Sequence, residues 1–419
     1  MNLTRMLAVL LMLVCSAILP IIAEAATFTV NSTIDDVDET PGDGVCATTV
    51  DSVCTLRGAI QEANALVGAD TIKVKAGLYM LTIAGASENA GATGDLDITD
   101  DLTITGTGAK NTFINGGKLD RVFHIIGPIS VTITNITIQN GLATERGGGI
   151  YIESGNVTIK GSTVSNNNTT SGGDFAYGGG IFNSGTLTIT KSTLSNSTIS
   201  SNSVSGGTDA YGGGIFNSGA LTITGSTISN NTASSASVVC AGGIMNYGTL
   251  TITGSTISNN TASANPAQIS YGGAIYNSGG TLTVAQSTIS NNTALGGNDA
   301  LGGGIFNDVG PLTITGVKIT NNAARGDFIG KGGGICDFYG EVTVKACTIS
   351  GNAASGKSLP GTGGGIYLED GVLKVQNASK IIRNLSSDEG GGIYYVGSGT
   401  GSISADSSVA KNIPDDIYP

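Results

Sequence analysis

Hydrophobic and polar residues alternate over short stretches through most of the chain. In Leu221-Thr222-Ile223-Thr224 every second residue is apolar, which is the period of a β-strand with one buried face. The neighbouring stretches 214–216 and 226–228 predict two further short strands in the same unit. None of these units contains a ten-residue apolar stripe of helical period, so the pattern predicts an all-β chain.

Two markers repeat along the chain with the same interval. Gly-Gly-Gly-Ile, or a close variant, occurs nine times, and successive copies lie 27 to 34 residues apart. Units of about 30 residues with three short strands are typical of a β-solenoid, in which each coil buries its apolar face against the next. We predict about twelve coils, roughly 55–60 Å in length at about 4.8 Å per coil. The second marker, Ser-Asn-Asn-Thr-Ala and its relatives, has its second asparagine at Asn167, Asn202, Asn231, Asn260, Asn292, Asn322, Asn352 and Asn384.

Each marker has a physical reason in such a fold. Glycine before each isoleucine lets the backbone turn with a positive φ. We expect the asparagine to lie at a left-handed corner and its amide to bond to the asparagine of the next coil. The segments between each asparagine and the next Gly-Gly, such as 203–211 and 262–271, vary in sequence. We expect them to form a row of polar loops along one side of the rod.

Both ends of a solenoid need caps. Residues 55–64 predict a capping helix with Thr55 as its N-cap, and its apolar face comprises Leu56, Ile60, Ala63 and Val67. The predicted organisation is a signal peptide at 1–25, an N-terminal cap at 26–75, irregular early coils at 76–146, β-helix repeats at 147–396 and a C-terminal cap at 397–419.

The first residues have the pattern of a secretion signal. Arg5 precedes an apolar run, and the run ends in the small-x-small cleavage pattern at 23–25. We expect a secreted or cell-surface protein, extracellular or periplasmic, without a transmembrane segment in the mature chain, because no second apolar span follows. In that oxidising setting Cys46 and Cys54, eight positions apart in a turn-rich stretch, are expected to form a disulfide.

Charge and composition exclude some functions. The 19 basic and 31 acidic residues give a net charge of −12, which argues against nucleic-acid binding because that needs a basic surface. His124 is the one histidine of the chain, so chemistry that needs two histidines from one chain is excluded.

Several motifs resemble one protein family. The run CTLRGAI at 54–60, followed by EAN at 62–64, resembles the CSLREA motif of secreted bacterial right-handed β-helix proteins. PGDGVC at 41–46, GDLDI at 94–98 and DRVF at 120–123 resemble the same family, and the glycine-rich repeats resemble those of polymorphic outer-membrane proteins. The resemblance implies a single-stranded right-handed parallel β-helix of the pectin-lyase-like type. Gly58 stands where the family has glutamate, so the return bond of a capping box to Thr55 cannot form.

Polysaccharide lyases and hydrolases share the fold that this resemblance implies, so acidic residues are candidates for catalysis. The alternative role for these acids and Arg121 is in solvated turns around the strand residues Leu96 and Ile98 and in an ion pair that orders an early coil. For the histidine the alternative is a structural role. The dense group of candidates is Asp95, Asp97, Asp100, Asp101 and Asp120 with Arg121, and His124 is a separate candidate.

Two other sets of residues suggest binding. One loop carries the acids Asp35, Asp36, Asp38 and Asp43. These acids are either Ca²⁺ ligands or a solvated acidic surface. The sequence predicts no other cofactor. Outward threonines on the first strand of each unit reflect either β-propensity or a flat array that binds an ordered lattice such as ice or crystalline polysaccharide. In four units both outward positions of this strand are threonine. These threonines are Thr188, Thr190, Thr222, Thr224, Thr251, Thr253, Thr313 and Thr315.

The sequence therefore predicts a non-catalytic β-helix protein that acts in adhesion or surface interaction, with a surface glycan or a protein as its ligand. A polysaccharide-active enzyme, either a pectate-lyase-like lyase or a glycoside hydrolase, is the alternative, and a lattice-binding threonine array is the second alternative.

Overall fold

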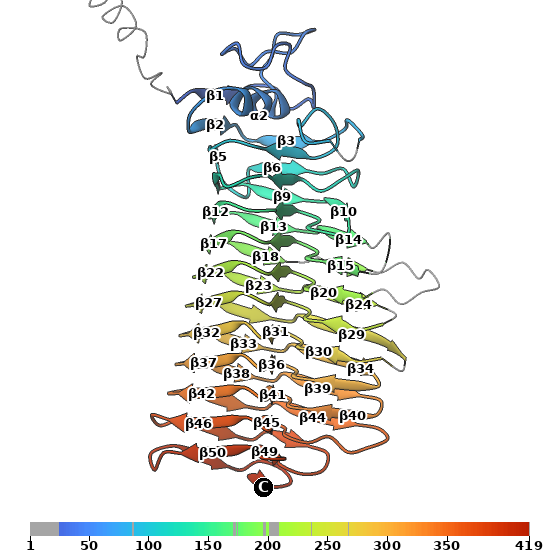
Figure 1. The fold of residues 1–419 in the computed structure, drawn as a ribbon, viewed down its shortest axis with the longest axis vertical. Helices are drawn as coiled ribbons and strands as arrows, with labels where there is room; N and C mark the ends of the chain where they lie inside the picture. Colours follow the sequence, from blue (N-terminus) through green and yellow to red (C-terminus); the bar gives the residue numbers. More distant parts are fainter. Residues whose placement is uncertain are drawn as a thin grey trace, which may run out of the picture.

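The structure is a computed structural model, and it describes residues 25–85, 88–170, 173, 175–195, 198–200, 209–235, 237–266 and 268–418. The predicted signal peptide, apart from Ala25, lies outside the described residues, and so does Asn202. The described chain forms a column of stacked parallel coils with helix α2 (Leu56–Ala65) at one end (Figure 1). This confirms the predicted all-β solenoid with an N-terminal helix.

Sheet A contains 13 parallel strands joined in chain order. It includes the strand predicted at 221–224, which begins one residue earlier. The strands of sheet A are β1 (Thr27–Val30), β2 (Asp70–Val74), β5 (Leu102–Thr105), β8 (Ser130–Thr134), β12 (Asn156–Lys160), β17 (Thr186–Thr190), β22 (Ala220–Thr224), β27 (Thr249–Thr253), β32 (Thr281–Ala285), β37 (Pro311–Thr315), β42 (Glu341–Lys345), β46 (Val372–Gln376) and β50 (Thr400–Ile403).

Sheets B and C contain 12 strands each and confirm the other two strands predicted for each unit. Sheet B comprises β3 (Gly77–Met80), β6 (Thr112–Asn115), β9 (Thr137–Gln139), β13 (Thr163–Ser165), β18 (Thr193–Ser195), β23 (Thr227–Ser229), β28 (Thr256–Ser258), β33 (Thr288–Ser290), β38 (Lys318–Thr320), β43 (Thr348–Ser350), β47 (Lys380–Ile382) and β51 (Ser408–Ala410). Sheet C comprises β4 (Leu96–Ile98), β7 (Phe123–Ile125), β11 (Ile150–Ile152), β16 (Ile181–Asn183), β21 (Ile215–Asn217), β26 (Ile244–Asn246), β31 (Ile275–Ser278), β36 (Ile305–Asp308), β41 (Ile335–Phe338), β45 (Ile366–Glu369), β49 (Ile393–Val396) and β52 (Ile417–Tyr418).

Where the structure describes the variable segments, they are not the row of loops that the sequence predicted, because much of the described part is β-strand. They form two further parallel sheets, whose strands pair from coil to coil through their backbone groups. Sheet D comprises β10 (Leu142–Thr144), β14 (Asn168–Thr170), β19 (Thr198–Ser200), β24 (Thr232–Ser235), β29 (Thr261–Pro266), β34 (Thr293–Gly297), β39 (Ala323–Gly326), β44 (Ala353–Gly356) and β48 (Leu385–Ser386). Sheet E comprises β15 (Phe175–Tyr177), β20 (Asp209–Tyr211), β25 (Val239–Cys240), β30 (Ser270–Tyr271), β35 (Asp299–Leu301) and β40 (Ile329–Lys331).

The interior of the column consists of rows of identical or similar apolar side chains. Leu187, Leu221 and Leu250 stand in register on sheet A, and each is buried. Isoleucines do the same on sheets B and C. Burial of each such side chain contributes about 1.5–3 kcal/mol, so repetition of the row stabilises the stack of coils.

The predicted asparagine ladder is present, but two adjacent residues share the roles assigned to one. Asn292 donates from Nδ2 to Oδ1 of Asn322 (2.9 Å) and accepts from Nδ2 of Asn260 (2.9 Å). The left-handed corner belongs to the preceding residue, Asn291, at φ 57°. The ladder ends where Asn412 donates to the carboxylate of Asp416.

A second amide ladder, which the sequence analysis missed, lies at the end of the sheet C strands. It runs from Asn183 through Asn217, Asn246 and Asn277 to Asn307, each side chain donating to the next. The last donor, Asn307, meets the buried carboxylate of Asp337, which can only accept. Leu368 occupies this position in the next coil and offers no acceptor, so a carboxylate suits the end of the ladder.

The N-terminal helix caps the first coil as predicted. The side chain of Thr55 accepts a hydrogen bond from the Gly58 amide, and Leu56, Ile60 and Ala63 are buried in the core. Val67 does not belong to the apolar face, because the helix ends at Ala65 and Val67 is exposed.

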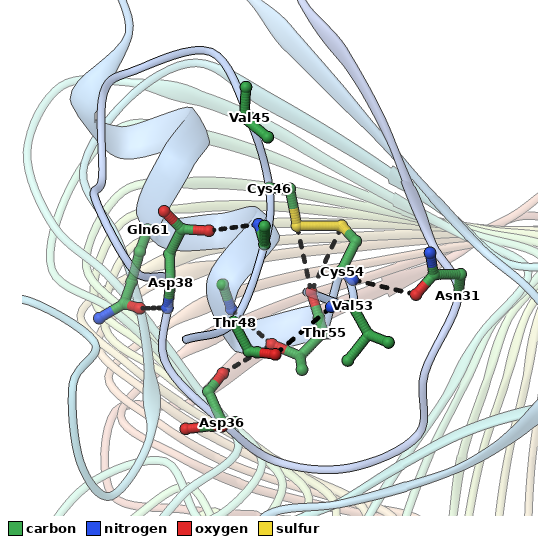
Figure 2. Close-up of a disulfide and its surroundings, with 12 residues drawn as sticks. Asn31, Asp36, Asp38, Val45, Cys46, Thr48, Val53, Cys54, Thr55 and Gln61 are labelled. Carbon is green, nitrogen blue, oxygen red and sulfur yellow. Dashed lines mark hydrogen bonds between the residues drawn. A yellow bond between two sulfur atoms is a disulfide. The ribbon is translucent and has the colours of Figure 1, made fainter. Parts of the chain in front are cut away.

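The predicted disulfide joins Cys46 to Cys54 beside the start of this helix (Figure 2). The loop that it closes is also held by the carboxylate of Asp38, which accepts from the Ala47 amide. The cap is thus fixed covalently and by hydrogen bonds.

Candidate functional site

The structure divides the predicted catalytic candidates into two groups. Asp95, Asp97 and His124 converge on the outer side of sheet C, close to the helix-capped end. Asp100 and Asp101 lie beyond the end of β4, where Asp101 accepts from the amide of Ser130. The latter two therefore do not belong to the cluster.

Asp97 and His124 are register partners on adjacent strands, β4 and β7. Nδ1 of His124 lies 3.1 Å from Oδ1 of Asp97, and both side chains are buried. The other oxygen of Asp97 accepts from the amide of Gly91, in the loop that covers this strand. The prediction that the acids only occupy turns is wrong for Asp97, which lies inside a strand.

The outer nitrogen of His124, Nε2, faces a carboxylate that the sequence analysis did not consider. It lies 3.4 Å from Oε1 of Glu153, but among the described residues it has no hydrogen-bond partner. The imidazole stacks on the ring of Tyr151 with the centroids 4.7 Å apart. A signal for Tyr151 was present, because Asp97, His124 and Tyr151 follow one another at steps of 27 residues.

Arg121 provides the positive charge of the cluster. Its Nη1 lies 3.4 Å from Oδ2 of Asp95, and its guanidinium carbon lies 5.4 Å from the centre of the Tyr151 ring. Burial raises the pKa of Asp95 to about 7, although Arg121 acts in the opposite direction. Burial also raises the pKa of Asp120, against the effect of the Arg121 amide and guanidinium.

The cluster opens into a cavity of about 440 Å³. Its wall carries four carboxylates and one guanidinium, so the cavity is a negative environment. The lining residues are Glu88, Asn89, Asp95, Asp120, Arg121, His124, Thr144 and Glu145.

Arg57 of helix α2 anchors this region to the helix-capped end of the column. Its guanidinium makes two hydrogen bonds to the carboxylate of Asp35, with Nε 2.7 Å from Oδ1. It also donates to the carbonyls of Gly91, Gly94 and Asp95. One buried side chain thus connects the 54–60 motif with the 94–98 motif.

The four acids proposed as calcium ligands have separate partners. Asp35 binds Arg57, Asp38 accepts from the amides of Thr40 and Ala47, and Asp43 accepts from the amide of Val45. Asp36 accepts from the next amide in the chain. Within the described residues these acids do not converge as the Asp95 cluster does.

The outward threonines of sheet A form aligned columns. Thr188, Thr222 and Thr251 are register partners, as are Thr190, Thr224 and Thr253. The first column continues to Thr313, whereas Ala285 interrupts the second column before Thr315.

Comparison with known proteins assigns the fold to a family. A sequence model described as the right-handed β-helix region matches residues 100–310, half of the chain. The chain belongs to the right-handed β-helix family. No curated protein matches this right-handed β-helix chain.

Solved structures with a similar arrangement are enzymes that share little sequence with this β-helix. Pectate lyase Pel9A is 12% identical with a TM-score of 0.33, over 93% of this chain and 80% of that chain. The A-module of the Azotobacter vinelandii mannuronan C-5 epimerase AlgE4 is 12% identical with a TM-score of 0.27, over 90% and 95%. The A-module of the A. vinelandii epimerase AlgE6 is 13% identical with a TM-score of 0.30, over 86% and 93%. At these identities the likeness concerns the fold alone.

Across the described part of the chain, no helix combines the length and the apolar character needed to cross a membrane.

Proposed function

We propose that this protein is a secreted or cell-surface β-helix with a non-catalytic role in surface interaction, and that sheet A is its binding face for a neutral glycan. The observation that carries the proposal is an unbroken column of eleven register-matched outward threonines. The column comprises Thr27, Thr71, Thr103, Thr132, Thr158, Thr188, Thr222, Thr251, Thr283, Thr313 and Thr343.

The column suits a long polymer of hydroxyl groups. Each threonine hydroxyl can donate and accept a hydrogen bond, and ten coil spacings of about 4.8 Å give a length of roughly 48 Å. Because the backbone of the sheet is fixed by its neighbours, binding would order few protein groups, which lowers the entropic cost of association.

The charge of the face supports a neutral ligand. From β17 to β37 the outward positions of sheet A hold only threonine, alanine and proline, in a chain with a net charge of −12. Lys160 on β12 and Lys345 on β42 delimit this uncharged patch.

Secretion is part of the same proposal. The signal-like residues 1–25, the Cys46–Cys54 disulfide and the resemblance of the 54–64 motif to secreted CSLREA-motif proteins support it. The resemblance of the repeats to polymorphic outer-membrane proteins agrees with a place at the cell surface.

The proposal is tested by retention on immobilised neutral polysaccharides, with uronic-acid polymers and ice as parallel arms. We expect retention by a neutral polysaccharide, weakened at least tenfold in the double variant Thr222→Lys, Thr251→Lys. The matched control, Thr227→Lys, Thr256→Lys on sheet B, should bind as the wild type does. Equal weakening by both pairs, or no retention on any neutral polysaccharide, contradicts the proposal; ice shaping alone would favour the lattice hypothesis.

A polysaccharide-active enzyme is the second candidate, and the cavity beside Arg121 favours it. A guanidinium, an imidazole and several carboxylates line a space open to solvent, which are the groups that acid–base chemistry on a sugar requires. The excess of carboxylates over cations opposes an anionic polymer, so this candidate ranks below the binding role.

The enzyme candidate is tested by incubating the protein with polygalacturonate and other uronic-acid polymers, with and without Ca²⁺, and recording unsaturated products by absorbance. Turnover that Arg121→Ala removes while the fold is intact would establish the enzyme. If no polymer yields a product, the result supports the non-catalytic binding role.

A further inference from the structure

We propose that Asp95, Asp97 and His124 form a site for one divalent transition-metal ion of the Zn²⁺ class. The proposal concerns the outer side of sheet C, so it is independent of glycan binding by sheet A.

The geometry is that of a partly assembled coordination shell. One ligand atom from each of the three side chains lies within 4.8 Å of the others, and all three residues are buried. The 3.1 Å separation of Asp97 Oδ1 and His124 Nδ1 is close to the edge of a tetrahedron whose metal–ligand bonds are about 2.0–2.1 Å long.

A carboxylate lies beside each ring nitrogen of His124. A neutral imidazole carries one proton. If that proton is on Nδ1, the lone pair of Nε2 faces Glu153; if it is on Nε2, the lone pair of Nδ1 faces Asp97 at 3.1 Å. A metal ion on Nδ1 removes this conflict, because Nε2 then carries the proton and points it at Glu153.

That arrangement also accounts for the unpartnered nitrogen. Nε2 is buried and lacks a hydrogen bond within the described residues, yet it is directed at Glu153 from 3.4 Å. In metal sites the second ring nitrogen of a histidine ligand usually donates to a carboxylate, which fixes the orientation of the ring. A small movement of the exposed Glu153 side chain completes such a bond.

Asp95 distinguishes a metal ion from a second proton on the imidazole. A proton would satisfy Asp97 and Glu153 but would not require a third group at the same point. The surrounding carboxylates are Asp95, Asp97, Asp120 and Glu153, and Arg121 is the nearby cation, because the buried Arg57 is paired with Asp35. Carboxyl groups therefore outnumber the nearby cation, and a bound dication would be balanced by the ionised forms of its ligands.

The ligand set indicates the class of metal. Imidazole nitrogen favours Zn²⁺ and related transition ions, whereas Mg²⁺ and Ca²⁺ prefer oxygen-only shells. Three protein ligands leave a fourth position toward the cavity for water or another ligand. The ion would join β4 to β7 and, through the Asp97–Gly91 bond, fix the loop that covers the first coil.

The test is titration of the untagged, metal-free mature protein with Zn²⁺ by calorimetry and with Co²⁺ by visible absorption. We expect one ion per chain, a Co²⁺ d–d band, and a higher melting temperature with Zn²⁺. Asp97→Asn and His124→Gln should abolish the band, Glu153→Gln should weaken affinity about 10–100-fold, and the control Asp100→Asn should bind as the wild type does.

Because His124 is the one histidine of the chain, its imidazole NMR signals provide a readout that does not depend on variants that fold poorly. Addition of Zn²⁺ should shift these signals at one equivalent. A doubly protonated His124 at pH 7 that Zn²⁺ does not perturb, the absence of stoichiometric binding, or equal binding by His124→Gln overturns the proposal.

Discussion

At the scale of single residues, neighbouring asparagines in each coil have unrelated tasks. Asn291 is exposed and occupies a left-handed corner at φ 57°, while Asn292 is buried in the amide ladder. Asn292 accepts from the backbone amide and the Nδ2 of Asn260 and donates to Asn322 and to the Ile257 carbonyl.

This difference predicts that the same substitution has a large effect on stability at Asn292 and a small effect at Asn291. Asn292→Gly leaves buried donors and acceptors without partners and should lower the free energy of unfolding by about 2–4 kcal/mol. Asn291→Gly keeps the left-handed corner, because glycine adopts this conformation readily. It should change the free energy of unfolding by less than about 1 kcal/mol. Urea denaturation of both variants checks this, and equal losses would contradict the division of roles.

The end of the second ladder is a titratable residue. Asp337 is fully buried and accepts from Asn307 Nδ2 and from the Gly340 amide. Burial raises its pKa from 3.8 to about 6 against the effect of these bonds, so the folded state holds the proton more tightly than the unfolded state does.

Stability should therefore depend on pH through Asp337. Its stabilising contribution is complete below pH 3.8 and is lost as the pH rises through about 6, by at most about 3 kcal/mol. Asp337→Asn keeps an acceptor for Asn307 and cannot titrate. The difference in free energy of unfolding between the variant and the wild type should therefore change between pH 4 and about 6 and stay constant at higher pH. Urea midpoints for both proteins from pH 4 to 8 test this; parallel curves would disprove it.

At the scale of elements, one buried side chain of the capping helix holds the loop at 91–95. Arg57 uses its planar fork on Asp35 and on the carbonyls of Gly91, Gly94 and Asp95. An ammonium group cannot reproduce this geometry. The loop over Asp97 therefore depends on a residue of the helix.

Arg57→Lys should lower the free energy of unfolding by about 2–4 kcal/mol, because it leaves part of a buried ion pair unsatisfied. Hydrogen exchange of the amides at 91–95 should become faster. The exposed Arg325→Lys on β39 is the control and should change neither quantity. Unchanged exchange at 91–95 in Arg57→Lys would show that the loop is held otherwise.

From β16 onward the outer face of sheet C is a second apolar layer rather than a solvated surface. Phe182 and Phe216 stack there with centroids 4.9 Å apart, and Tyr177 of sheet E packs edge-on against Phe216. Residues of sheet E, such as Cys240 and Leu301, cover this apolar face of sheet C.

At the scale of the whole molecule, the coils approach so closely that some positions cannot carry a side chain. A Cβ on Gly303 would lie 2.3 Å from the Ala323 carbonyl carbon and 2.5 Å from the Gly333 oxygen. Gly316 has room for a Cβ but lies at φ 63°. The first glycine serves the stacking of coils, and the second serves the turn.

Gly303→Ala should lower the free energy of unfolding by about 3 kcal/mol or more, because backbone atoms of two coils must move apart. Gly316→Ala should cost about 1–2 kcal/mol, the ordinary penalty for alanine in the left-handed region. Denaturant titration of both variants measures the difference. A larger loss for Gly316→Ala would contradict the stacking argument.

The local sequence determined the repeating part of the fold. Alternating Leu-Thr-Ile-Thr, glycine before isoleucine and paired asparagines each specify a strand, a turn or a corner within a few residues, and repetition at about 30 residues makes these signals add. The helix at 55–64 and the disulfide between Cys46 and Cys54 are local in the same sense.

The tertiary structure alone decided what lies together across coils. Asp97 and His124 are 27 residues apart and Arg57 is further away still, and only the register of stacked strands brings them to one place. Asp100, three residues from Asp97, points elsewhere because side chains and turns change direction within a few residues of a strand.

Sheet D begins at the Thr-Ala that ends the asparagine marker, and alanines such as Ala233, Ala262 and Ala294 lie in register there. Alanine does not favour strands, so this repeat did not predict a sheet. The strands of sheet E are two or three residues long, too short for an alternating pattern to show.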